Sequence, residues 1–336
     1  MNLLTGEMGD SKKLNTLLSQ ARSFIMGVAM LLIMLFHNAF GALGKVERLF
    51  SIYGHWGVDI FIFLSGFGLY HALARTKGTS IKNFYLRRLT RLMPAAVLAG
   101  VCLYELGYAS WWGLAGLNLW YVRTILVLYL LAPVIYKLTI RYSPGYVVAG
   151  GVCVSTLGVL IGKSLLFTCS PEVYTALVWT LARLSAFVIG LCIARVNWDV
   201  KALCNWRYIL FFVVGLAALL YLHYLRYITG SFSDYLHLLP YVLLSLIIPG
   251  CCLLLAGVYR VTADFIRKIV IFFGTYSLEI YLVHEAIFKA VAALDIAAGL
   301  KFLLAYGVSA LLALVLHYVA VWVLRAIRAL ASLRCA

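Results

Sequence analysis

Two side chains in the first part of the chain have the chemistry of a general-base site. His37 ends the apolar stretch MGVAMLLIMLFHN, and Asp59 lies near the start of GHWGVDIFIFLSGFGLY. An imidazole held by a carboxylate can take a proton from a hydroxyl near neutral pH. Both residues lie in apolar runs, where an ionisable side chain is costly unless it has a partner or a function. The structural alternatives are a histidine that hydrogen-bonds a neighbour and an aspartate that pairs with Arg123.

Later apolar runs contain further polar groups. In GTYSLEIYLVHE, the spacing of Ser277, Tyr281 and His284 places them on one helix face, and Glu279 on another side. His317 is alone in its apolar run, which predicts a packed, neutral core histidine. Histidines at the ends of runs, such as His55, are expected to be interfacial and without a special role. Candidates for stabilising an oxyanion or positioning a substrate are Tyr121, Arg123, Arg183, Glu279, Tyr281 and His284.

A third group of residues is basic. The stretch NFYLRRLTRLMP contains Arg87, Arg88 and Arg91, just before or at the start of an apolar run. Arginines in such positions often do no more than set the orientation of a membrane helix. The functional alternative is an anchor for a phosphorylated ligand, because a guanidinium binds phosphate through two parallel hydrogen bonds.

Composition determines which elements can position these residues. Of 336 residues, 64% are hydrophobic and only 12% are charged, and the mean hydropathy is +0.99. So few polar residues cannot cover a water-exposed surface, which excludes a soluble domain. The basic excess falls in short clusters between apolar runs, which argues against nucleic-acid binding. The cysteines form no CxxC pair, so neither a disulfide framework nor a metal site is expected.

Apolar runs long enough to cross a bilayer about 30 Å thick predict an all-α, polytopic membrane protein with ten transmembrane helices. The predicted spans are roughly 23–42, 55–74, 91–108, 119–138, 146–166, 175–194, 207–225, 236–258, 269–292 and 301–325.

The distribution of basic residues predicts the orientation. With the N-terminus in the cytoplasm, 20 Lys and Arg fall in inner segments and 6 in outer segments, as the positive-inside rule requires. Both termini are therefore expected to be cytoplasmic, in a multi-pass protein of the cell membrane. The predicted organisation is an N-terminal tail over 1–21, a transmembrane domain over 22–326 and a C-terminal tail over 327–336. In this orientation His37, Asp59 and Arg123 share an outer layer.

The order of these motifs resembles the acyltransferase 3 family of integral-membrane O-acyltransferases. The resemblance rests on His37, then GVDIFIFLSGF, FYLRRLTRLMP, LWYVRTILVLYLLAPVIY, RLSAFVIG and YSLEIYLVH, in family order over roughly residues 20 to 325. It implies transfer of an acyl group, by default acetyl, from cytoplasmic acyl-CoA to a hydroxyl of a carbohydrate or similar acceptor near the outer face. It also implies that His37 is the base and that Asp59 orients or charges it. Arg88 and Arg91 would serve the phosphates of CoA.

One position departs from the family pattern. Family members usually carry Arg or Lys eleven residues before the histidine, where this chain has Met26. Arg22 is one helical turn away on the same face, about 5.4 Å along the axis, and a long side chain can cover part of that distance. The hypothesis is that Arg22 supplies the missing charge.

Two alternatives to catalysis remain at this stage. Ten helices with buried charges and Gly/Pro interruptions also suit a small-solute permease, although no internal repeat is evident. The other alternative is a non-catalytic protein of the same fold, which binds its ligand without turning it over. The sequence does not choose among acceptors such as a surface polysaccharide, a lipid-linked sugar or a small secreted molecule.

Overall fold

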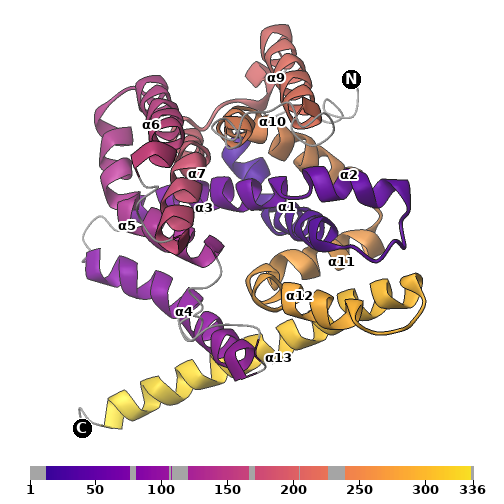
Figure 1. Cartoon of the computed structure of the whole chain (residues 1–336). Coiled ribbons are helices and arrows are strands. Elements are labelled where there is room, and N and C mark those ends of the chain that lie inside the picture. Colours follow the sequence, from indigo (N-terminus) through magenta and orange to yellow (C-terminus); the bar gives the residue numbers. More distant parts are fainter. Residues whose placement is uncertain are drawn as a thin grey trace.

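The computed structural model describes residues 13–75, 81–105, 107, 120–165, 171–203, 205–225 and 239–333. These residues are helical almost throughout, with short turns between the helices (Figure 1). The prediction of an all-α protein is confirmed. The helices are α1 Leu14–His37, α2 Lys45–Tyr53, α3 Trp56–Ala74, α4 Ile81–Glu105, α5 Trp120–Arg141, α6 Pro144–Leu165, α7 Pro171–Val196, α8 Val200–Leu203, α9 Trp206–Tyr224, α10 Leu239–Val261, α11 Asp264–Thr275, α12 Ser277–Ala292 and α13 Ala298–Leu333.

Within the described residues, eight segments are long and apolar enough to cross a membrane. The chain is therefore a polytopic membrane protein, as predicted. The eight segments correspond to all predicted spans except the third and the ninth. The third, α4, begins at Ile81 and carries Lys82, Arg87, Arg88 and Arg91 in its first three turns. The ninth is divided into α11 and α12.

The division of the ninth span has a direct structural consequence. The backbone leaves the helical region at Tyr276, with φ −100° and ψ 19°, and α12 starts at the next residue. The new axis buries Ser277, Glu279 and Tyr281, three polar side chains in its first two turns. A continuous straight helix over 269–292, as the hydropathy predicts, would orient these three side chains differently.

Glycines allow the central helices to approach each other closely. In Figure 1, α3 and α7 cross near the middle of the molecule. A methyl group at Gly66 of α3 would collide with the carbonyl of Phe187, and one at Gly190 of α7 would collide with the carbonyl of Phe63. Small residues at such crossings replace side-chain contact with backbone contact, the usual mode of tight helix packing in membranes.

The N-terminal end of α1 is attached to the body of the protein. The amide of Leu14 donates to the carbonyl of Trp198 at 2.8 Å, and the side-chain amide of Asn15 donates to the carbonyl of Ala194 at 2.7 Å. Leu14, Leu17 and Leu18 are buried. Thus the last eight residues of the predicted tail 1–21 belong to α1, because their leucines recur at helical spacing; residues 1–12 are outside the described part of the chain.

Candidate active site

A cavity of about 400 Å³ lies between α1, α3, α4, α5, the end of α11, α12 and α13. Three arginines line it, together with hydroxyl-bearing, acidic and imidazole side chains. Its described polar lining consists of Arg22, Ser65, Arg88, Thr90, Arg91, Tyr121, Tyr129, Thr275, Ser277, Glu279, Tyr281 and His317. A volume in this range is typical of a small-molecule site.

The arginines of the cavity come from two helices. Arg88 and Arg91 are three residues apart on α4 and share one face, and Arg22 joins them from α1. The Nε groups of Arg22 and Arg88 are buried without a hydrogen-bond partner in the described structure. Three like charges with unused donors favour an anion. Arg87, by contrast, does not line the cavity and donates its Nε–H to the carbonyl of Asn83 at 3.1 Å within its own helix.

Arg22 and Met26 both line this cavity. The guanidinium of Arg22 lies against Gly68 of α3, where a methyl group would come within 3.2 Å of one terminal nitrogen. Arg22 therefore occupies the space that a side chain at Gly68 would take, and its charge faces the same cavity as Arg88 and Arg91. This placement favours the hypothesis that Arg22 replaces the cation missing at Met26.

At its other end the cavity is bounded by aromatic rings that pack against one another at steep angles. Tyr121 and Tyr281 line it, and their ring centroids are 4.8 Å apart. The ring of Tyr281 is 5.6 Å from that of His284, which in turn packs edge-on against His37 at 5.2 Å. His37 itself, half-buried at the end of α1, is not among the described residues that line the cavity. A ligand in the cavity is thus separated from His37 by two side chains.

The backbone holds His284 in one tautomer. Its Nδ1 is 2.9 Å from the carbonyl of Tyr281 and 3.2 Å from that of Ile280, so Nδ1 carries the hydrogen and donates. Nε2 of the neutral ring is then an acceptor. It has no hydrogen-bond partner in the described residues, and the side chain is 2% exposed. A buried, unpartnered acceptor beside His37 is an unusual feature that calls for a ligand or a proton.

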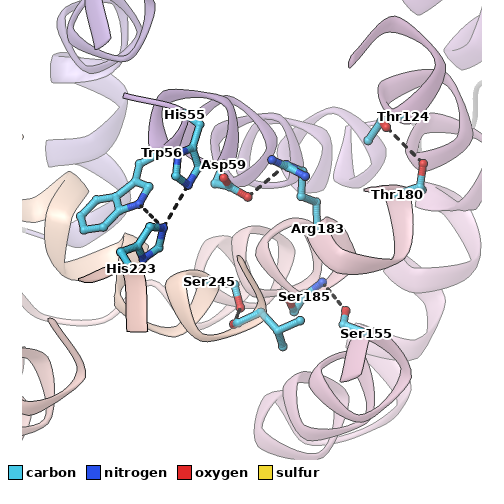
Figure 2. A network of polar contacts seen from close by, with 11 residues as sticks. His55, Trp56, Asp59, Thr124, Ser155, Thr180, Arg183, Ser185, His223 and Ser245 are labelled. Atoms are coloured by element: carbon cyan, nitrogen blue, oxygen red, sulfur yellow. Dashed lines mark hydrogen bonds and ion pairs between the residues drawn. The ribbon is translucent and has the colours of Figure 1, made fainter. Parts of the chain in front are cut away.

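Asp59 has a different partner from the one expected. Its carboxylate is 3.3 Å from Nε of Arg183 in α7, and both side chains are buried (Figure 2). The structure therefore pairs Asp59 with a span arginine and not with His37. The charge of Arg183 is further enclosed by three rings, those of Trp120, Trp179 and Tyr241, at 4.4 to 4.6 Å, and cation–π contact stabilises a desolvated guanidinium. Arg123, in the first turn of α5, is half-buried and outside the described lining of the cavity.

Two histidines expected at the membrane interface are buried instead. Their Nε2 atoms, on His55 at the start of α3 and His223 near the end of α9, are 3.2 Å apart (Figure 2). Nδ1 of His223 is 2.9 Å from the carbonyl of Leu219, so it donates, and Nε2 accepts from His55 and from Trp56. This pair joins the end of α9 to α3.

The prediction for His317 was wrong. Its Nδ1 lies 2.7 Å from a carboxylate oxygen of Glu279, and both residues line the cavity. The imidazole is 36% exposed, so it is neither alone nor packed in a core. Glu279 and His317 are 38 positions apart in the sequence, on α12 and α13. No spacing rule connects them, and the sequence offers no signal that would have paired them.

A comparison with known protein families identifies the family of the chain. The model of the acyltransferase domain of the acyltransferase 3 family matches residues 25–322. The chain belongs to the acyltransferase 3 family. This acyltransferase is therefore an enzyme, and the family resemblance predicted from the sequence is confirmed. No curated protein and no solved structure matches the acyltransferase.

Proposed function

We propose that this acyltransferase moves an acyl group, by default acetyl, from acyl-CoA to a hydroxyl of a carbohydrate or similar acceptor. The observation that carries the proposal is the cavity itself. One end presents Arg22, Arg88 and Arg91, and the other ends at Tyr281, behind which His284 and His37 are in contact. A donor with phosphates at one end and a thioester at the other matches this polarity.

The distances suit a long donor. Arg22 and His37 are fifteen residues apart on α1, a rise of about 22 Å. CoA carries its phosphates and its thioester at opposite ends of an extended pantetheine arm. Such a ligand would bind the arginines with its phosphates and reach Tyr121 and Tyr281 with its acyl group.

The proposed topology has ten crossings, with α4 as the third and the broken α11–α12 as the ninth. Both termini then face the cytoplasm, and the enzyme lies in the cell membrane. The arginine end of the cavity opens toward cytoplasmic acyl-CoA, and His37 lies toward the outer face. The inner segments carry most of the basic residues, which supports this orientation.

The proposed chemistry uses His37 as the base, and it requires the rings of Tyr281 and His284, which separate His37 from the cavity, to move apart when both substrates are bound. His37 takes the proton of the acceptor hydroxyl as its oxygen attacks the thioester carbonyl carbon; the C–O bond forms, the C–S bond breaks, and the proton passes to the departing thiolate. A donor must stabilise the oxyanion in between. The hydroxyls of Tyr121 and Tyr281 belong to side chains that line the cavity, whereas Arg183 is enclosed by aromatic rings and paired with Asp59. The tyrosines are therefore the better candidates, and Asp59 acts through Arg183.

The test uses the purified protein in lipid vesicles with acetyl-CoA and a hydroxyl-bearing oligosaccharide. We expect free CoA thiol and an acetyl ester on the sugar to appear in equal amounts. A permease would instead accumulate solute without consuming the thioester. If the protein neither bound nor consumed acetyl-CoA, the donor would be wrong.

Arg22 offers a second test. Arg22→Ala should raise the KM for acetyl-CoA by about tenfold or more, because a charge-assisted hydrogen bond contributes about 1.5–3 kcal/mol. Arg22→Ala combined with Met26→Arg should recover part of the loss, since both positions line the cavity. The matched control is Arg87→Ala, whose side chain is outside the described lining and should leave KM unchanged. Normal transfer by Arg22→Ala would disprove the compensation.

A further inference from the structure

The Glu279–His317 pair lies in the wall of the cavity between its two ends, and the mechanism above does not use it. We propose that this pair hydrogen-bonds the amide-bearing arm of the acyl donor and so selects donors that carry such an arm. The inference rests on the proposed function, because it concerns the ligand of the same cavity.

The pair has unused hydrogen-bonding capacity on the cavity side. One carboxylate oxygen of Glu279 is hydrogen-bonded to Nδ1 of His317. The other carboxylate oxygen can accept a hydrogen bond, and Nε2 of the imidazole is a second polar atom. Both residues line the cavity. Glu279 is only 7% exposed, and its position is set by the helix start at Ser277.

The Glu279–His317 pair lies between the sites proposed for the two ends of the ligand, its phosphates and its acyl group. On α12, Glu279 precedes His284 by five residues, about 7.5 Å along the axis. Arg22, at the other end, lies about 22 Å from His37 along α1. The remaining wall includes apolar side chains, among them Met26, Leu278 and Val321. A carboxylate and an imidazole in this part of the wall can recognise a ligand segment at one or two points.

The negative charge of Glu279 limits which segment of a ligand can lie against the pair. A carboxylate repels phosphates and other anions, so Glu279 excludes a second phosphate subsite here, while the arginines favour one at their own end. A carboxylate oxygen and an imidazole nitrogen suit an uncharged segment that offers N–H or O–H donors and carbonyl acceptors. Amide groups in a flexible chain have this chemistry, and the pantetheine arm has two of them.

A purely structural role is the competing explanation, since the pair also joins α12 to α13. A structural clamp would affect every donor alike. Recognition of the arm would affect only donors that have one. The experiment therefore compares two thioesters, acetyl-CoA and S-ethyl thioacetate, which lacks the amides and the phosphates.

We expect Glu279→Gln and His317→Asn each to raise the KM for acetyl-CoA by about tenfold, the size of one lost hydrogen bond to a charged group. The kcat with acetyl-CoA, and kcat/KM for S-ethyl thioacetate, should stay within about twofold of the wild type. The double variant should lose no more than about the larger single loss, because the two side chains act as one unit. The matched control is Asp264→Asn, an exposed acid of α11 paired with Lys268 outside the cavity.

Three results would overturn the inference. Equal losses with both donors would make the pair structural, and an unchanged KM for acetyl-CoA would place the arm elsewhere. If a variant were too unstable for kinetics, binding of CoA to the wild type and to Glu279→Asp would decide: equal affinity with a shortened carboxylate contradicts a contact with the arm. Failure of the wild type to consume acetyl-CoA would be the separate failure of the proposed function.

Discussion

His37→Ala is expected to lower acyl transfer by about 10²- to 10⁴-fold, the usual contribution of a general base. Of the described imidazoles, His284 packs against His37 and could substitute for it as the base. Binding of acetyl-CoA should be nearly unchanged, because His37 is not among the described residues that line the cavity. The measurement is the initial rate of ester formation at saturating donor, together with the Kd for CoA.

The control for His37→Ala is His71→Ala, a half-buried histidine of α3 whose ring packs against Phe67 and Tyr70. It should retain the wild-type rate. His284→Ala distinguishes the two imidazoles: if His37→Ala transferred normally and His284→Ala did not, the base would be His284, whose Nε2 is already held as an acceptor.

Asp59→Asn is expected to destabilise the fold before it affects chemistry. Removing the carboxylate leaves the Arg183 guanidinium buried without its ion-pair partner, and breaking a buried pair in this way costs about 3–5 kcal/mol. Thermal unfolding of the detergent-solubilised protein should show a large decrease in the midpoint. Replacing both members, Asp59→Asn with Arg183→Met, should recover much of the loss, because an apolar chain of similar length also packs against the three rings.

The opposite outcome for Asp59→Asn, a loss of transfer without a loss of stability, would change the role assigned to Asp59. If Asp59→Asn kept the wild-type stability and lost only transfer, Asp59 would serve the reaction directly, as the sequence motif suggests. The conservative Arg183→Lys variant adds a second readout. Lysine keeps the charge but loses the planar contact with Trp120, Trp179 and Tyr241. We therefore expect the unfolding midpoint of Arg183→Lys to lie between those of the wild type and Asp59→Asn.

The sequence predicted most of the helices and much less of their contacts. Hydropathy located α3, α5 and α10 to within a few residues, because a bilayer demands continuous apolar runs. It did not predict α2, a helix of nine residues that is too short to cross a bilayer. Nor did it predict the break at Tyr276, where the chain has neither proline nor glycine.

Partners across helices were the least predictable part of the site. Arg123 was the arginine that the sequence suggested as a partner for Asp59. The crossing of α3 with α7 at Gly66 and Gly190 brings Arg183 into reach instead. The arginine segment was easier, since the face shared by Arg88 and Arg91 follows from a spacing of three residues. The pairing of Glu279 with His317 depends on how α12 and α13 pack, and no local pattern encodes that.

The packed rings of Tyr121, Tyr281 and His284 affect the permeability of the membrane to protons as well as the reaction. A transferase that receives its donor from one side of a membrane and its acceptor from the other needs a route between them. A continuous column of water along that route would conduct protons and dissipate the electrochemical gradient. These three buried rings, each 9% exposed or less, pack against one another and leave little room for such a column. The resting enzyme would thus be expected to insulate the membrane and to shield its thioester from futile hydrolysis.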